Sequence, residues 1–247
     1  MTNQNTAIWD QVYKTDPAHT KQAVVSGQKI TSISGMAMVM RATEVFGPVG
    51  TGWGWEVAEE RFDKGGPIFD ESKDKDGKVS REIIGYETGH TIKIRLWYMQ
   101  EGERKEIYQY GCTPFMYRSK WGITTDTEAP KKSLTDAIKK ALSMLGFSAD
   151  IFLGMFDDKD YLQSRHEEAA IEAAEDKAAE IERQREERLE WLKGVIEAMD
   201  TAQSKYELDK LHTSAVRSAS TRKETQFVTR LARAHEENVK RLAEGKA

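Results

Sequence analysis

Four lysines in the second half of the chain are the residues whose type and spacing best suit contact with a charged ligand. Lys131, Lys132, Lys139 and Lys140 lie within ten residues and are opposed only by Asp136. On a helix, positions 132, 136, 139 and 140 share one face, because they are three or four residues apart. Cations repeated along one face can follow a phosphate backbone. The same pattern is typical of a solvated helix face, which the spacing taken alone favours.

A second basic group precedes these lysines. Arg118 and Lys120 alternate with the aromatic residues Tyr117 and Trp121. Cations beside aromatic rings are the arrangement that holds single-stranded nucleic acids, because phosphates meet the cations while bases stack on the rings. The chain has six tryptophans, which suit a hydrophobic core equally well.

The carboxylates Asp157, Asp158 and Asp160 are the one candidate for metal chemistry, since paired carboxylates can hold Mg²⁺ in a nuclease. Lys159 interrupts them, so helix capping or local ion pairing is the favoured interpretation, with a metal-dependent nuclease as the alternative. The five histidines are dispersed, Cys112 is the single cysteine, and no G-x-x-x-x-G-K-[ST] loop occurs. We therefore expect no catalytic residues, no metal site and no cofactor.

The overall charge does not favour a nucleic-acid binder. The 247 residues carry a net charge of −4, with a pI of about 5.9. Residues 1–162 carry 21 basic against 23 acidic residues, and residues 163–247 carry 16 against 18. Nucleic-acid binding would therefore need a local concentration of cations on one surface.

The chain has the composition of a cytoplasmic protein. A single cysteine suits a reducing compartment. The first residues are polar and show no signal peptide, and no apolar run reaches the length of a membrane helix. We expect a cytoplasmic protein without a membrane segment.

Apolar spacing predicts a helix from Ile33 to Phe46, ending at Gly47, and alternation predicts a strand around Trp53 and Trp55. The polar, turn-rich residues 63–81 predict a long exposed hairpin connection. A long strand should follow from Ile83 to Met99, with its apolar face formed by Ile92, Ile94, Leu96 and Tyr98.

A further strand at Ile107–Tyr110 would complete an antiparallel meander, and a cation-rich loop would lead to a helix over Ala129–Leu145. The apolar stripe of that helix consists of Leu134, Ile138, Ala141, Leu142 and Leu145. These elements predict an α+β fold, with a helix–antiparallel β-meander–helix core (β-β-β-α type) and a C-terminal all-helical appendage.

The composition changes after Leu162, where large apolar residues become rare until Leu189. Three short apolar-periodic segments then follow. We expect four parts: an N-terminal arm over 1–25, a core over 26–162, a helical charged linker over 163–186 and a small C-terminal helical bundle over 187–247. A bundle of that size is near the lower limit for independent stability.

An ordered set of motifs gives the core a family likeness. The stretch from Gln28-Lys29 to Trp55 resembles the Gln-Lys, strand, Gly, helix, Phe-Gly, turn, Trp segment of the Rad-fifty-two-like superfamily of single-strand DNA annealing proteins. The other matching motifs are Gln109-Tyr110-Gly111, Arg118-Ser119-Lys120, Thr135–Leu142, Leu145-Gly146 and Asp158–Tyr161. The likeness covers about residues 25–162, and the short helical C-terminal part is closest to the phage and prokaryotic recombinase branch. That branch implies the cytoplasm of a bacterial or phage-infected host cell.

The resemblance implies a protein that binds single-stranded DNA and anneals complementary strands without ATP, in homologous recombination or phage DNA repair. It implies a homo-oligomer, a ring or a helical filament, with a basic groove for the DNA. By motif position, Lys139 and Lys140 match the basic pair of the groove floor, Arg118 and Lys120 match a second basic cluster, and Lys29 matches a lysine of the first strand. Lys131 and Lys132 extend the expected DNA-binding set.

The chain departs from eukaryotic members of that family at three positions. Ser143 replaces a basic residue, Pro48 replaces a tyrosine, and Ala37 replaces an arginine of the first helix. Arg41 lies one helical turn after Ala37 and is the candidate substitute. By analogy, the C-terminal bundle would recruit a host single-strand-binding protein or a phage exonuclease; the alternative is an appendage that regulates assembly. An oligomeric interaction protein without a nucleic-acid role remains a further alternative.

Overall fold

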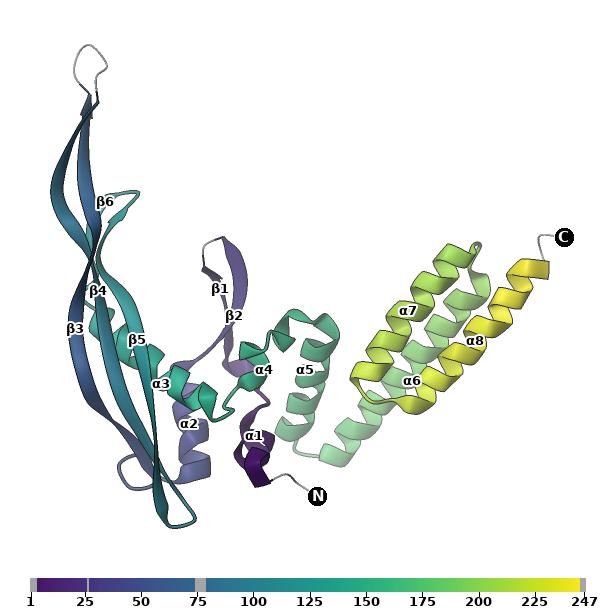
Figure 1. Cartoon of the computed structure of the whole chain (residues 1–247). Coiled ribbons are helices and arrows are strands. Elements are labelled where there is room, and N and C mark those ends of the chain that lie inside the picture. Colours follow the sequence, from purple (N-terminus) through teal and green to yellow (C-terminus); the bar gives the residue numbers. More distant parts are fainter. Residues whose placement is uncertain (1–3, 26, 74–78, 245–247) are drawn as a thin grey trace. The chain divides into compact units, whose positions relative to one another are not determined.

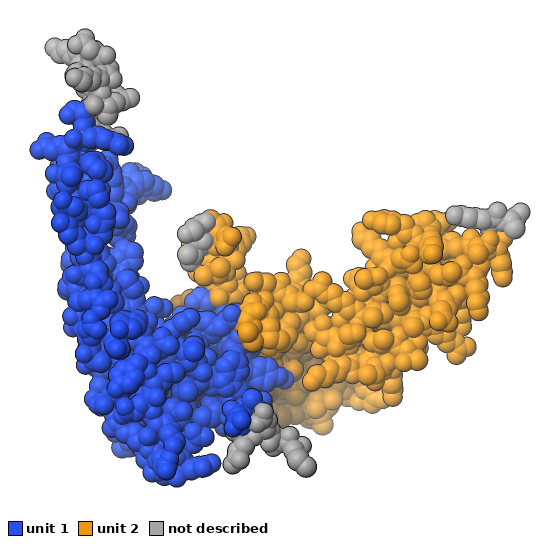
Figure 2. Space-filling model, viewed as in Figure 1, with its two compact units in different colours: residues 1–14, 32–152 blue, residues 15–31, 153–247 orange. Residues whose placement is uncertain are grey.

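The computed structural model of the chain describes residues 4–25, 27–73 and 79–244. It divides into two compact units, which Figures 1 and 2 show. Unit 1 comprises residues 1–14 and 32–152, and unit 2 comprises residues 15–31 and 153–247. Helices and antiparallel strands occur together, which confirms the predicted α+β class. No helix among the described residues is long and apolar enough to cross a membrane.

Unit 1 is built around a four-stranded antiparallel sheet in the order β3–β4–β5–β6. α3 lies against β4 and β5 on one face of that sheet (Figure 1). The elements of unit 1 are η1 (Gln4–Thr6), α1 (Ala7–Val12), α2 (Gly35–Phe46), β3 (Trp53–Lys73), β4 (Val79–Gln100), β5 (Glu103–Ser119), β6 (Gly122–Thr125), α3 (Ala129–Met144) and α4 (Ala149–Phe152).

The core of unit 1 lies between the inner face of β4 and the helices. Ile92, Ile94, Leu96 and Tyr98 are all buried, which confirms the predicted apolar face of this strand. The predicted stripe of α3 is also confirmed: its central members are buried, and Leu134 and Leu145 pack at the edge of the same cluster. Burying one large apolar side chain stabilises a fold by about 1.5–3 kcal/mol, so this cluster holds the sheet and helices together.

The close approach of α3 to β5 depends on Gly111. A Cβ atom at this position would lie 2.0 Å from the carbonyl oxygen of Ser133 and 2.7 Å from the amide nitrogen of Ala137. Both of those atoms belong to the backbone of α3, which cannot rotate away as a side chain can. Only glycine therefore allows the helix to pack at this distance from the strand.

The prediction of a long hairpin connection over 63–81 is wrong for most of that range. β3 continues to Lys73 and β4 begins at Val79, so the two strands stay paired through Ser72↔Ser80 and Lys73↔Val79. The remaining residues, 74–78, lie outside the described part of the chain. The two strands form a ribbon that is largely exposed on both faces, so its polar sequence lacks the alternation that marks a half-buried strand.

The segment after the meander also differs from the expected loop. β5 extends to Ser119 and therefore includes Arg118, and β6 pairs with its end from Gly122 to Thr125. Lys120 and Trp121 occupy the tight turn between these strands. A strand of four residues with one partner leaves too short a pattern to be recognised in the sequence.

The expected N-terminal arm contributes to the core of unit 1. The side chain of Val12 is 1% exposed and belongs to the central hydrophobic cluster. The backbone carbonyls of Val12 and Tyr13 accept hydrogen bonds from the amides of Ser148 and Asp150, at 3.1 and 3.2 Å. The first residues of the chain are thereby fixed to the segment that follows α3.

Unit 2 contains the C-terminal helices and a short hairpin. β2 begins in unit 2 and ends in unit 1. Its elements are η2 (Pro17–His19), β1 (Thr20–Val25), β2 (Gln28–Ile33), η3 (Met155–Asp157), α5 (Lys159–Ala173), α6 (Lys177–Thr201), α7 (Lys205–Thr221) and α8 (Thr225–Glu244). α6, α7 and α8 match the three helical segments expected near the C-terminus, and they enclose a second hydrophobic cluster around Leu192, Leu208 and Leu231.

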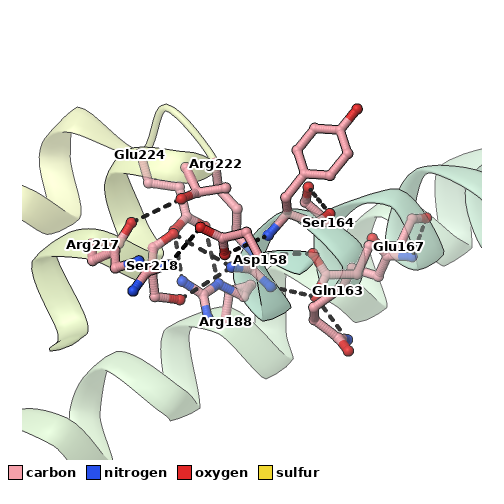
Figure 3. A network of polar contacts seen from close by, with 12 residues as sticks. Asp158, Gln163, Ser164, Glu167, Arg188, Arg217, Ser218, Arg222 and Glu224 are labelled. Atoms are coloured by element: carbon pink, nitrogen blue, oxygen red, sulfur yellow. Dashed lines mark hydrogen bonds and ion pairs between the residues drawn. The ribbon is translucent and has the colours of Figure 1, made fainter. Parts of the chain in front are cut away.

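One ion pair connects α5 to the end of α7, and another connects α6 to the segment before α8 (Figure 3). Arg222 pairs with Glu167 at 3.0 Å, and Arg188 pairs with Glu224 at 2.7 Å. The stretch 163–186, expected to be a charged linker, forms most of α5 and the start of α6, with a break at 174–176. One of its carboxylates, that of Glu167, is thus the partner of an arginine at the end of α7.

The close contact at Gly111 predicts that two alanine substitutions in unit 1 differ in their effect on the free energy of unfolding. Gly111→Ala should lower the free energy of unfolding by about 1–3 kcal/mol, because the added Cβ overlaps the backbone of α3. Gly85→Ala on β4 is the matched control, since no atom lies within 4 Å of its Cβ position. That variant should be unchanged or more stable by about 0.4–1 kcal/mol. Urea unfolding measures both, and equal stability of the two variants would contradict the close approach.

Candidate nucleic-acid interface

α3 carries the four lysines of the first basic group on the side that faces away from the core. The helix begins at Ala129 with Pro130 in its first turn, a position that tolerates proline because the amide there has no helical partner. Ser133, Ala137 and Ala141 are buried against the sheet. The helical repeat therefore directs Lys131, Lys132 and Lys140 toward solvent and leaves Lys139 half-buried.

Lys131 and Lys132 lie in the first turn of α3, where the helix dipole disfavours positive charge. Acidic residues just before the helix compensate for this. The Nζ of Lys132 is 2.5 Å from Oδ2 of Asp126, and the Nζ of Lys131 is 2.8 Å from Oε2 of Glu128. The ion pair with Lys132 lowers the pKa of Asp126, and the same contact raises the pKa of Lys132. Both lysines thus already have a carboxylate partner.

Lys139 has a different environment from the lysines of the first turn. Its side chain is half-buried, and its Nζ donates a 3.4 Å hydrogen bond to Oγ of Ser32. Burial lowers the pKa of Lys139, and the negative charge of Asp136 offsets part of that effect. Lys139 is therefore an ammonium group held in a fixed place, with fewer water contacts than a surface lysine.

Lys140 is exposed and makes no ion pair or side-chain hydrogen bond with any residue that the structure describes. The two neighbouring lysines therefore offer a ligand two different contacts. Lys139 supplies a half-buried cation with a hydrogen-bond partner, and Lys140 supplies an exposed one that can reach a charged group without first leaving a partner among the described residues.

A shallow depression of about 310 Å³ lies along this face of α3. Three cations and one carboxylate take part in its lining, which consists of Lys131, Lys132, Thr135, Asp136 and Lys139. This agrees with the helical spacing, which placed 132, 136 and 139 on one face. The local charge of the depression is positive, although the chain as a whole is acidic.

The second basic group is on the β5–β6 hairpin and does not line this depression. Arg118 is on β5, where its guanidinium donates a hydrogen bond to the backbone carbonyl of Phe69 on β3. Lys120 is in the turn, with its Nζ 5.0 Å from the centre of the Trp121 ring. Both basic residues are exposed.

Arg41 is hydrogen-bonded within unit 1, whereas Lys29 is exposed. The guanidinium of Arg41 donates to Glu44 at 2.7 Å and to the backbone carbonyl of Gln11 at 2.8 Å, so it ties α2 to α1. Lys29 is on β2 in the part of the chain that belongs to unit 2.

Two partners of the α3 lysines could not be predicted from the sequence. Asp126 contacts Lys132 and Ser32 contacts Lys139, and neither partner is at helical spacing from its lysine.

The acidic cluster near residue 158 has a structural role. The carboxylate of Asp158 caps α5 by accepting hydrogen bonds from the amides of Asp160 and Tyr161. It also pairs with Arg217 at 2.5 Å, a contact that lowers the pKa of Asp158. The favoured interpretation, capping and local ion pairing, is confirmed for this residue. Among the described residues, no group of three or more histidine, cysteine or acidic side chains is placed to hold a metal ion.

Comparison with known protein families gives a match over most of unit 1 and the start of unit 2's C-terminal part. A family model described as Rad52/22 family double-strand break repair protein matches residues 8–168. These residues include α1, the whole sheet, α3 and most of α5. No curated protein matches the chain.

The burial of Lys139 predicts a titration that can be observed directly. The side-chain NMR resonances of Lys139, assigned from their absence in Lys139→Arg, should titrate at a lower pH than an ordinary lysine, because burial disfavours the ammonium form. Asp136→Asn should move the midpoint lower still, since it removes the charge that favours the ammonium. A midpoint at or above that of an ordinary lysine would contradict the burial.

Proposed function

Because the chain belongs to the Rad52/22 family of double-strand break repair proteins, we propose that it binds single-stranded DNA and anneals complementary strands without ATP. The observation that carries the proposal is the cationic face of α3, which lies within the matched region. It combines Lys139 with Lys140, whose side chain has no partner among the described residues. The biological setting would be homologous recombination or phage DNA repair in the bacterial cytoplasm.

The energetics of pairing explain why such a protein needs no nucleotide. Forming a DNA duplex releases about 1.4 kcal/mol per base-pair step. The difficulty in annealing lies instead in bringing together two flexible polyanions with their bases available. A surface that binds phosphates and leaves the bases free reduces that difficulty, and the protein then acts by binding, with no covalent step.

The lysines of α3 would take unequal shares in DNA binding. Lys139 and Lys140 can contact phosphates directly, and they form the centre of the proposed site. Lys131 and Lys132 must exchange the carboxylates of Glu128 and Asp126 for phosphates, so each contributes less net free energy. Arg118, Lys120, Lys29 and Arg41 complete the proposed set, with Arg41 limited by its pairing to Glu44.

Assembly would reconcile the acidic chain with DNA binding. We propose that the protein forms a homo-oligomer, a ring or a helical filament. Repetition of the α3 face would then produce a continuous positive track, although each subunit carries a net charge of −4. Counterions released from the DNA backbone would make binding strongly dependent on salt.

The C-terminal helices would serve a separate purpose. α6, α7 and α8 have their own hydrophobic cluster, distinct from that of unit 1. We propose that they recruit a partner such as a host single-strand-binding protein or a phage exonuclease. Tyr206, 80% exposed on α7, is a suitable contact residue for such a partner.

Removing the central lysines should abolish annealing. Lys139→Ala/Lys140→Ala should bind single-stranded DNA at least about tenfold more weakly at moderate salt, and should reduce the slope of log affinity against log salt by about 1.4, since two phosphate contacts to a single strand are lost. Fluorescence anisotropy over a salt series and a strand-annealing assay measure these effects. Lys205→Ala/Lys210→Ala on α7 removes the same charge and should behave as wild type. Full annealing by the Lys139/Lys140 variant with an intact fold would disprove the assignment.

The class of activity can be tested in a second assay. Complementary oligonucleotides should anneal at the same rate with and without ATP, and a labelled single strand should remain full length in Mg²⁺. Cleavage that disappears in Asp158→Asn would favour the alternative of a metal-dependent nuclease. A chain whose tryptophan fluorescence does not respond to oligonucleotide would favour an interaction protein without a nucleic-acid role.

A further inference from the structure

Trp121 is exposed to an unusual degree for its type. Its side chain is 86% exposed, the highest value for any large hydrophobic side chain in the described part of the chain. Trp53, by contrast, is fully buried in the core. An indole that contributes so little to burial does not stabilise the fold appreciably, so its position calls for another explanation.

The turn that carries Trp121 is fixed by its own hydrogen bonds. Ser119 Oγ accepts a hydrogen bond from the amide of Trp121 at 3.2 Å and donates one to the carbonyl of Gly122 at 3.0 Å. The same hydroxyl lies 3.0 Å from Oγ1 of Thr124, on the opposite strand. Gly122 has a φ of +112°, which glycine adopts without strain. The backbone is thus held in place while the indole projects from the end of the hairpin.

Two cations accompany the exposed ring. Lys120 Nζ lies 5.0 Å from the ring centre, a cation–π distance that occupies one face of the indole and leaves the other available. Arg118 is two residues before Lys120 and is also exposed. One of its N–H groups is used on the carbonyl of Phe69, and a guanidinium has five such donors.

We propose that Trp121 stacks on an unpaired nucleobase of the bound strand, while Lys120 and Arg118 contact the flanking phosphates. The inference rests on the proposed function and adds a base contact to the phosphate contacts of α3. The cations argue for a nucleic acid rather than for an apolar surface of a second subunit. An apolar partner would remove these charges from water without neutralising them, which is costly, whereas a phosphate backbone neutralises them.

Stacking of this kind tolerates any base, because every base has a π-face. The two faces of a base within duplex DNA are already covered by its neighbours. The hairpin would therefore favour single strands over duplexes without selecting a sequence, which is the property that annealing of arbitrary complementary strands requires.

The test compares the full-length chain with Trp121→Ala on two oligonucleotides of equal length, one of mixed sequence and one with abasic sugars. The variant should bind the mixed-sequence strand about 5- to 150-fold more weakly, the range expected for the loss of one base–aromatic stack. Wild type and variant should bind the abasic strand equally, because no base is present to stack. Trp121→Tyr should keep most of the affinity, and Trp121→Leu should lose it, because leucine has no π-face.

Tyr206→Ala is the matched control, since Tyr206 is exposed to a similar degree, 80%. It should bind both strands like wild type. Equal affinity of Trp121→Ala and wild type for the mixed strand would overturn the inference. An equal loss on both strands would also overturn it, as would a changed oligomeric state of Trp121→Ala by light scattering. Each of these outcomes leaves the proposed function intact, provided that wild type anneals and Lys139→Ala/Lys140→Ala does not; failure of wild type to bind DNA would overturn both.

Discussion

The contact between α3 and β5 is the constraint on which the arrangement of unit 1 depends. Gly111 lets the backbone of α3 approach the strand, and Ser133 then donates a buried 3.1 Å hydrogen bond to the carbonyl of His90. These two contacts fix the rotation of the helix about its axis. Ala137 and Ala141 consequently face the sheet, and Lys131, Lys132 and Lys140 are exposed on the other side of the helix. The proposed DNA-binding surface is thus a consequence of a packing contact on the other side of the same helix.

The chain as a whole is acidic, but positive charge is concentrated on one face of α3. The lysines at the start of α3 are paired with Asp126 and Glu128, whereas Lys140 is exposed and has no side-chain partner among the described residues. Lys139 is partly withdrawn from water, which lowers its pKa and also holds its ammonium group in one position. A phosphate that meets such a group displaces less water than it would at a fully solvated lysine. Lys139 thus offers a phosphate a cation that is already hydrogen-bonded in place, and the adjacent Lys140 offers an exposed one.

Unit 2 relies more on ion pairs between helices than unit 1 does. Its hydrophobic cluster is small, and many of its side chains are Glu, Ala and Arg. Arg222 and Arg188 reach carboxylates on other segments and are themselves well shielded, with side-chain exposures of 9% and 16%. Ion pairs that are shielded from solvent are screened less by salt than surface pairs are. The charged stretch 163–186 thus supplies partners to the bundle in addition to connecting it.

The sequence by itself determined the elements whose residues alternate between water and a core. The apolar face of β4, the stripe of α3 and the three C-terminal helices could all be read from periodicity, because burial on one side forces a pattern on neighbouring positions. The family likeness likewise rested on ordered motifs, and residues 8–168 match the family. Only the tertiary structure decided the length of the β3–β4 ribbon, the existence of β6 and the partners of each lysine. A ribbon exposed on both faces leaves no apolar period, and an ion pair such as Lys132–Asp126 depends on where the chain turns before the helix.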